Sequence, residues 1–391
     1  MTAEGSASKR LLLDTNLRIL FGVTLVAVLG VSSITPAFPK IVRELGISPQ
    51  TIGLLITVFT FPGVLLTPVL GVLADRFGRK RILVPSLLLF GIAGFACAFV
   101  SDFRLLLGLR FFQGVGAASL GSLNVTIIGD LYSDKERTAA MGYNASVLSI
   151  GTASYPAIGG ALAMLGWHYP FLLPLVALPV GFLVLFSLKN PEPVGAEGLK
   201  DYLSGVWTSI KRRQVIGLFV VSTATFIILY GPFLTYFPLL LGASFGTSTL
   251  VIGLLMSVSS LSSAFTASQL GRLARAASEA TLVKVAFVLY ALTLLMMPFV
   301  RSLWLFVIPS IIFGVAQGMN LPSIQTLLAG LAPMTHRAAF MSINGMVLRL
   351  GQTLGPLTAG VVFGIWGMGG TFFAGVALAI SMFALAVILI R

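Results

Sequence analysis

The sequence predicts an all-α polytopic membrane protein, with 12 transmembrane helices in two pseudo-symmetric bundles of six. Of its 391 residues, 57% are hydrophobic and 9% are charged, with a mean hydropathy of +1.00. A soluble domain is about 25% charged. Apolar runs of about 20 residues, the length that crosses a hydrocarbon core as a helix, recur along the chain. The chain also matches itself at a shift of 200 residues.

The first half of the chain supplies six of the predicted helices. A polar lead precedes the first, and tight charged turns separate most of the others. The first helix ends among Pro36 and Pro39, and we expect a loop with Lys40, Arg43 and Glu44 after it. The expected ranges are 17–38, 51–73, 82–100, 105–128, 138–164 and 169–188.

The longest polar segment, residues 189–213, separates the two halves. Its Tyr202 and Trp207 suit a short helix at the membrane interface. We expect an N-terminal bundle at 1–188, a cytoplasmic linker at 189–213 and a C-terminal bundle at 214–391. The later helices are expected near 214–238, 250–271, 281–300, 303–329, 338–363 and 371–390.

An internal repeat relates the two halves. At the 200-residue shift, glycines, prolines, arginines and asparagines coincide in one register without a gap. Examples are Gly114 with Gly314, Arg137 with Arg337, Asn144 with Asn344, Gly151 with Gly351 and Pro156 with Pro356. Two parallel six-helix repeats predict a binding site near the membrane midplane, between the halves.

The basic residues predict the orientation. Two of the 25 Lys and Arg residues, Arg110 and Arg349, lie within predicted helices. If the N-terminus is cytoplasmic, most of the others face the cytoplasm. The outer loops hold only Lys40, Arg43, Arg104 and Arg301. Cytoplasmic loops are enriched in Lys and Arg. We therefore expect both termini inside, in the cell (inner, cytoplasmic) membrane.

Several function classes find no support in the residues. The net charge of +13 would suggest nucleic acid for a soluble chain, but here the charges lie in the loops of a membrane protein. One cysteine and two histidines form no metal-binding pattern, and no phosphate-binding Gly-Lys-Ser/Thr loop occurs. No nucleophile–base pair appears either. We expect no metal, cofactor, enzymatic activity or nucleic-acid partner, and a monomer in the lipid bilayer.

A short charged stretch, residues 71–83, joins the second and third predicted helices. Interface anchoring explains its cations, but it does not explain the acid Asp75. The stretch resembles the signature loop of the major facilitator superfamily of transporters, Gly-x-Leu-Ala-Asp-Arg-x-Gly-Arg-Lys, at every specified position from Gly71 to Lys80. The resemblance implies a gating motif of Gly71, Asp75, Arg76, Gly78, Arg79, Lys80 and Asp130.

Within this motif, Asp75 is expected to face the start of the eleventh helix when the cytoplasmic side closes. Arg79 is expected to pair with Asp130 at the end of the fourth helix. The second copy has decayed, since Arg275 and Ser278 stand opposite Asp75 and Gly78.

Two arginines fall inside predicted helices, where an uncompensated charge is costly. Arg110 is either a cation of the central cavity or a side chain that reaches the outer interface, and the family has a similar Arg-x-x-Gln-Gly pattern, often tied to proton transfer. Arg349 is either a cavity cation or an arginine that binds backbone carbonyls between helices. The full set of cavity candidates is Arg110, Gln113, Asn124, Asn144, Tyr155, Tyr230, Tyr236, Gln317, Asn320, Arg349 and Gln352.

Helix five carries a glycine-rich face that resembles the antiporter motif of the same family, except that Tyr155 replaces a glycine. Close helix packing explains the face equally well. The packing or hinge candidates are Gly142, Gly151, Pro156, Gly159, Gly160, Gly351, Gly355 and Pro356. We expect Gly151 between helices five and eight, and Gly355 between helices two and eleven.

The leading functional prediction is a secondary transporter that exports small amphipathic or drug-like molecules, with proton antiport as one driving mechanism. All 12 acids lie in loops or at helix ends, so Asp14 and Asp130 are the nearest proton carriers. One alternative is uptake or exchange of an organic anion bound by Arg110 and Arg349. Another is a non-transporting receptor or lipid-handling protein.

Overall fold

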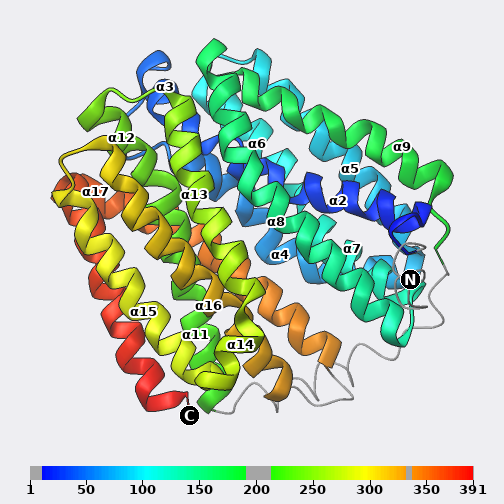
Figure 1. Cartoon of the computed structure of the whole chain (residues 1–391). Coiled ribbons are helices and arrows are strands. Elements are labelled where there is room, and N and C mark those ends of the chain that lie inside the picture. Colours follow the sequence, from blue (N-terminus) through cyan, green and yellow to red (C-terminus); the bar gives the residue numbers. More distant parts are fainter. Residues whose placement is uncertain (1–10, 191–212, 332–336, 391) are drawn as a thin grey trace.

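The computed structural model describes residues 11–190, 213–331 and 337–390, and every regular element in these ranges is a helix (Figure 1). Most spans consist of more than one element. The first half contains α2 (Thr15–Ser32), η1 (Thr35–Ala37), α3 (Phe38–Glu44), α4 (Leu54–Phe77), α5 (Arg79–Ala96), η2 (Cys97–Phe99), α6 (Phe103–Ala117), α7 (Leu120–Leu131), α8 (Asp134–Leu165), η3 (Tyr169–Val176) and α9 (Ala177–Ser187). The second half contains α11 (Arg213–Ile228), η4 (Leu229–Tyr236), α12 (Phe237–Phe245), α13 (Thr249–Ser268), α14 (Leu270–Ala276), α15 (Glu279–Met296), η5 (Met297–Phe299), η6 (Leu303–Phe306), α16 (Val307–Leu331) and α17 (Arg337–Leu389).

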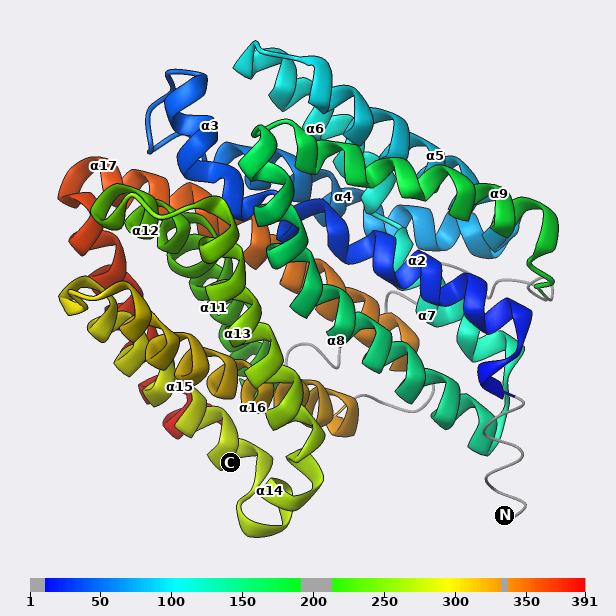
Figure 2. The same cartoon turned by 45° about the horizontal axis from the view of Figure 1, so that its top comes forward.

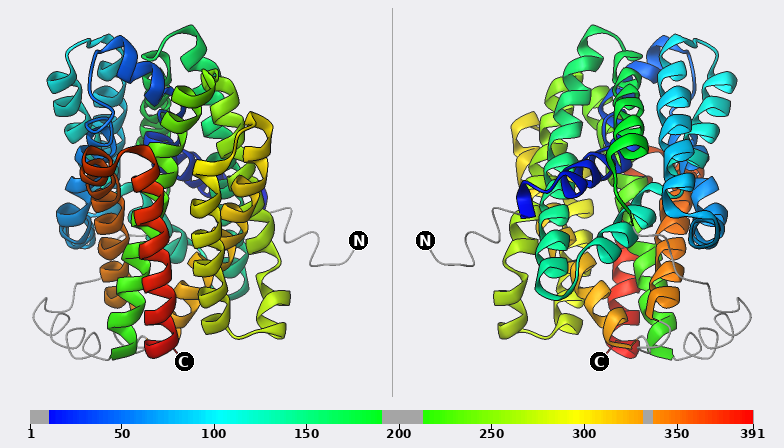
Figure 3. Two further views of the ribbon diagram at one scale, coloured as in Figure 1. Left: turned by 90° about the vertical axis from the view of Figure 1, so that its left-hand side faces the viewer. Right: turned by 90° about the vertical axis from the view of Figure 1, so that its right-hand side faces the viewer.

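The described residues form 11 continuous helical segments long and apolar enough to cross a membrane, and the last of them is two spans. A straight helix of the 53 residues in α17 would be about 80 Å long, far beyond a bilayer core. The chain reverses at Gly367, whose φ of +67° suits glycine. Figure 3 shows the two parts of α17, orange and red, side by side. The predicted fold of 12 spans is therefore confirmed.

The first span is longer than predicted. Pro36 and Pro39 lie in the first turns of η1 and α3, where a proline needs no N–H donor, so the helix continues to Glu44. The predicted loop with Lys40, Arg43 and Glu44 is therefore wrong. Lys40 Nζ instead donates to the carbonyl oxygens of Ala163 and Met164, at 3.1 and 3.2 Å.

Helices of each half pack mainly on one another. In the first half, α2 packs on α7, α8 and α9, and α5 packs on α4, α6 and α9. In the second half, α16 packs on α13 and α15, while α17 packs on α11 and α15. The predicted linker lies largely outside the described residues, so the predicted domain boundaries stay a prediction.

The two halves contact one another through α8 with α13, α4 with α17, and α3 with α12. The close contacts gather at one end, which we call the closed end. At this end, five glycines lie so close to the other half that an added Cβ would touch a residue there. The pairs are Gly242 with Pro39, Gly360 with Gln50, Gly53 with Pro356, Gly253 with Pro156 and Gly160 with Thr249.

The opposite end of the molecule, which carries residues 71–83, we call the open end. A Cβ placed on Gly71, Gly142, Gly271 or Gly345 would have no described heavy atom within 4 Å. Figures 1 and 2 show the halves converging near α3 and α12 and spreading apart toward α7 and α14.

Candidate functional site

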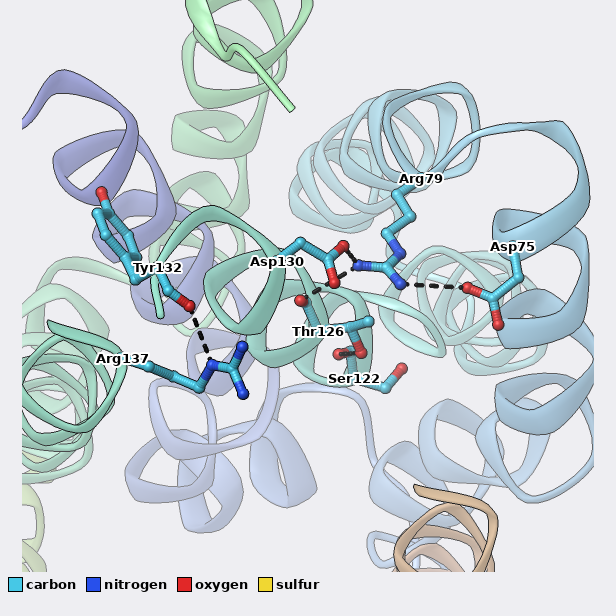
Figure 4. Close-up of polar contacts among 7 residues, drawn as sticks. All are labelled: Asp75, Arg79, Ser122, Thr126, Asp130, Tyr132 and Arg137. Atoms are coloured by element: carbon cyan, nitrogen blue, oxygen red, sulfur yellow. Dashed lines mark hydrogen bonds and ion pairs between the residues drawn. The ribbon is translucent and has the colours of Figure 1, made fainter. Parts of the chain in front are cut away.

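The charged loop at the open end is organised around Arg79 (Figure 4). Gly78 ends α4 with a φ of +99°, which lets the chain reverse so that Arg79 is the first residue of α5. Arg79 Nη1 forms an ion pair with Asp130 and donates to the Thr126 carbonyl oxygen at 3.2 Å, and Nη2 lies 3.5 Å from Asp75 Oδ1. One guanidinium thus joins the ends of α4, α5 and α7, and the predicted pairing of Arg79 with Asp130 is present.

Neighbouring basic side chains bind the carboxyl ends of other helices. Lys80 Nζ donates to the Leu188 carbonyl oxygen at 3.1 Å, just after α9, and Arg137 Nε donates to the Tyr132 carbonyl oxygen at 2.9 Å. The last carbonyls of a helix lack partners within it and carry partial negative charge. Lys80 therefore does more than anchor the loop at the interface.

Asp75 differs from Arg79 in its exposure. The Asp75 side chain is 49% exposed, against 11% for Arg79. A Cβ on Gly71 of α4 or on Gly345 of α17 would meet no described atom within 4 Å, and the two halves spread apart toward this end (Figures 1 and 2). The expected approach of Asp75 to the start of the eleventh helix, near Ala338 and Ala339, therefore stays a prediction for a conformation closed here.

Arg110 is sealed inside the first half. It is 1% exposed; its Nε donates to the Leu55 carbonyl oxygen at 3.0 Å, and its Nη1 donates to Gln113 Oε1 at 2.7 Å. Its Cζ lies 4.2 Å from the centroid of the Phe59 ring, a cation–π contact. These partners lie on α4 and α6, so in this conformation Arg110 is not accessible to a solute between the halves.

We expect Arg110→Ala to lower the free energy of unfolding by about 1–2 kcal/mol, because it leaves a void and an unpartnered Gln113 amide. Loss of a buried charge without a carboxylate partner offsets part of this cost. Arg110→Met, which fills the space, should cost less. Thermal unfolding of the purified protein tests both, and an unchanged melting temperature for Arg110→Ala would contradict the sealed placement.

Arg349 has different surroundings from Arg110. Arg349 is half-buried, and its Nη1 donates a hydrogen bond to Gln352 Oε1 at 3.2 Å. No described backbone carbonyl accepts a hydrogen bond from its guanidinium. The alternative of an arginine held by carbonyls therefore fits Arg110, through Leu55, and not Arg349.

Other predicted polar residues form small networks within each half. In the first half, Asn124 Nδ2 donates to Thr24 Oγ1 at 2.6 Å, and Thr24 Oγ1 donates to Asn144 Oδ1 at 2.5 Å. In the second half, Asn320 Nδ2 donates to Thr225 Oγ1 at 2.7 Å. The sequence reasoning missed the two threonines, although a polar residue in an otherwise apolar run was the available signal.

The tyrosines are spread over the molecule. Tyr290, on α15, is fully buried and donates a hydrogen bond to Gln317. Tyr236 belongs to the closed end, where its hydroxyl donates to the Pro49 carbonyl oxygen at 3.4 Å and its ring stacks on Phe363. Tyr155 lies half-buried beside Gly151 on α8. These residues do not form one cluster.

Gly151 and Gly355 each pack within their own half. A Cβ on Gly151 would lie 3.1 Å from atoms of Leu25 and Val28 in the same half, and one on Gly355 would approach Gly231 and Ile227, also in its own half. The predicted positions of Gly151 and Gly355 between the halves are therefore wrong, because these glycines point to the opposite side of their helices.

The other candidate glycines sort by their partners. Gly159 packs on Ser33 and Gly351 on Thr223, each within one half. Three residues contact the other half: Gly160 packs on Thr249, Pro156 on Gly253, and Pro356 on Gly53. Gly142 has no close packing partner, so it is not a packing glycine in this conformation.

The acids of the described residues lie in loops or near helix ends. Asp14 caps α2, since its Oδ1 accepts a hydrogen bond from the Leu17 N–H at 3.1 Å. Asp130 lies one residue before the end of α7 and pairs with Arg79. The described part of the chain also contains no group of three or more metal-ligating side chains.

Two helical halves that meet at one end, part at the other and carry a charged loop at the parted end have the architecture of a membrane transporter. The chain belongs to the Major Facilitator Superfamily, whose family model matches residues 20–300 and 233–391. It is therefore a multi-pass membrane protein.

Among curated relatives, Multidrug resistance protein 1 of Bacillus subtilis (strain 168) is 27% identical over 375 residues, which cover 94% of this chain and 95% of the relative. Tetracycline resistance protein, class B, of Escherichia coli is 25% identical, with 90% and 89% covered.

Solved structures share the fold. The nucleoside transporter NupG superposes with a TM-score of 0.79 at 14% identity, over 97% of this chain and 100% of that one. A bacterial homolog of the human lysosomal transporter Spinster gives a TM-score of 0.76 at 17% identity, with 95% of each chain covered.

Proposed function

We propose that the chain is a secondary active exporter that works by alternating access. The observation that carries the proposal is the uneven contact between the halves. Backbones touch at the closed end, as at Gly160 with Thr249, whereas Gly71 and Gly345 have open surroundings at the other end. An exporter needs two such arrangements with opposite ends open, and a rocking of the halves supplies them.

The proposed orientation places the open end in the cytoplasm. Lys and Arg are concentrated in the segments at this end, including Arg76, Arg79, Lys80 and Arg81. In this proposal both termini are cytoplasmic, the protein lies in the cytoplasmic membrane as a monomer, and the described conformation is ready to receive a solute from inside the cell.

The proposed solutes are small amphipathic organic molecules. Similarity to proteins named for multidrug and tetracycline resistance, over nine-tenths of the chain, supports this substrate class. A proton gradient is the proposed energy source, with Asp14 and Asp130 as carriers. Asp130 can take up a proton only as its ion pair with Arg79 is released, which would couple protonation to the charged loop.

Transport by purified protein in liposomes tests this function. We expect imposed pH gradients to drive amphipathic dyes across the membrane, and matched liposomes without a gradient or without protein to give only passive leakage. If no member of a panel of cationic, neutral and anionic solutes moves faster than leakage, the proposal of transport is wrong. If movement is independent of the gradient, proton coupling is wrong.

A further inference from the structure

Arg349 lies within a membrane-spanning segment, and no carboxylate of the described residues pairs with it. It is 12 residues into α17, about 18 Å along the helix axis from Arg337. The ion pairs of the described residues are Lys40 with Glu44 and Arg79 with Asp75 and Asp130. A lone charge at this depth costs several kcal/mol unless water or an anion solvates it.

Arg349 also marks the last contact along the seam between α4 and α17. From the closed end, Gly53 meets Pro356, and Thr57 Oγ1 donates to the Thr353 carbonyl oxygen at 3.1 Å. Next, a Cβ on Gly63 would lie 3.2 Å from Arg349 Cδ, and one turn further on, Gly345 has open surroundings. The guanidinium therefore lies where the seam ends and the space of the open end begins.

The surroundings of Arg349 are both polar and aromatic. Gln352 accepts a hydrogen bond from Arg349, and the hydroxyl of Tyr230 is near enough to interact with the charge of Arg349. The Tyr230 ring packs against Phe226 with centroids 5.9 Å apart. Arg349 is half-buried and so keeps exposed surface for a ligand, whereas Nη2 of Arg110 is buried without a partner.

We propose that Arg349 binds the acidic group of an amphipathic organic anion, a carboxylate or sulfonate, while the half-buried Tyr230 ring, which Phe226 supports, contacts its apolar body. A carboxylate accepts two parallel hydrogen bonds from a guanidinium, and such pairs are strong where water is scarce. Arg110 does not share this role, because its partners and its burial exclude a ligand. The inference rests on the proposed transport function and narrows its substrate class.

Equilibrium binding to the purified protein, with naphthoate, naphthamide and naphthylmethylamine as probes, tests the assignment. The three probes share one apolar ring system and differ in charge. We expect wild type to bind naphthoate about tenfold or more tightly than naphthamide, and the amine most weakly. Arg349→Gln should remove this preference, and Arg349→Lys should keep part of it. Arg275→Gln, at an exposed arginine of α14, is the matched control and should behave as wild type.

Equal binding of the three probes by wild type would overturn the assignment, even if the variants failed to fold. So would an undiminished preference for naphthoate in Arg349→Gln. Binding is measured without transport, so the two proposals fail separately. If naphthoate binds through Arg349 but never moves in liposomes, the transport proposal is wrong. If neutral and cationic solutes move without any preference for anions, only this inference is wrong.

Discussion

Gly160→Ala is expected to force the halves apart at the closed end and to shift the protein toward a conformation that is open there. A Cβ at this position would collide with the Thr249 carbonyl oxygen, and would lie 3.0 Å from Thr249 C and 3.2 Å from Leu250 Cα. These are backbone atoms of α13, so a side-chain rotation cannot relieve the overlap. Overpacking costs about 1–3 kcal/mol, which corresponds to a change of about fivefold to about 150-fold in the ratio of the two conformations.

Spin-label distances across both ends of the molecule measure this shift. We expect Gly160→Ala to shorten the distances across the open end and to lengthen those across the closed end. Gly253→Ala should act in the same way, because a Cβ there would collide with the Pro156 carbonyl oxygen of the other half. Distance distributions identical to wild type in both variants would show that the seam does not control the conformation.

Two other glycines of α8 provide matched controls for Gly160→Ala. Gly142→Ala meets no described atom within 4 Å and should leave the distance distributions unchanged. Gly159→Ala would collide with the Ser33 backbone, which belongs to the same half. It should therefore lower the melting temperature without favouring either conformation. The adjacent glycines Gly159 and Gly160 thus separate the stability of one half from the contact between the halves.

These glycines also show the limit of the sequence-based prediction. Composition, apolar run length and the internal repeat predicted the fold, because each depends on features that a lipid environment imposes along the whole chain. They also identified α8 as a closely packed helix. The rotation of α8 decides which glycine meets which half, and one residue changes the direction by about 100°. The pattern therefore did not show that Gly160, and not Gly151, lies on the seam.

The same limit applies to the two intramembrane arginines. Both follow from the sequence as costly charges, and both precede a glutamine by three residues, as in Arg110 with Gln113 and Arg349 with Gln352. Only tertiary packing distinguishes them. Arg110 donates a hydrogen bond to a carbonyl of α4 and contacts the Phe59 ring, whereas the Arg349 side chain faces a glycine, Gly63, on α4. By contrast, the pairing of Arg79 with Asp130 was predictable, because the loop pattern that places them is local.

Arg79→Ala is expected to destabilise the first half and to reduce transport strongly. The variant would leave Asp130 without its ion pair and the Thr126 carbonyl oxygen without its side-chain donor, at a site where the lost side chain is 11% exposed. Removing one partner of a largely buried pair costs about 2–4 kcal/mol. Thermal unfolding and transport in liposomes measure the two effects, and a melting temperature equal to that of wild type would show that the network holds no helix ends together.

Asp75→Asn should change the ratio of the two conformations and leave the stability nearly unchanged. This result would distinguish the role of Asp75 from that of Asp130, the other acid that contacts Arg79. Asp75 is half-exposed and 3.5 Å from Arg79, and Asp130 keeps the guanidinium in place when Asp75 is neutral. When the open end closes, the negative charge of Asp75 is expected to meet the partly positive start of α17, a contact worth about 0.3–1 kcal/mol if exposed and about 2 kcal/mol if partly buried. Losing about 1.4 kcal/mol would change the ratio about tenfold in favour of the described conformation.

Arg275→Ala, at the equivalent position of the second half, should have no such effect. An unchanged distribution of spin-label distances in Asp75→Asn would mean that the loop sets only the topology.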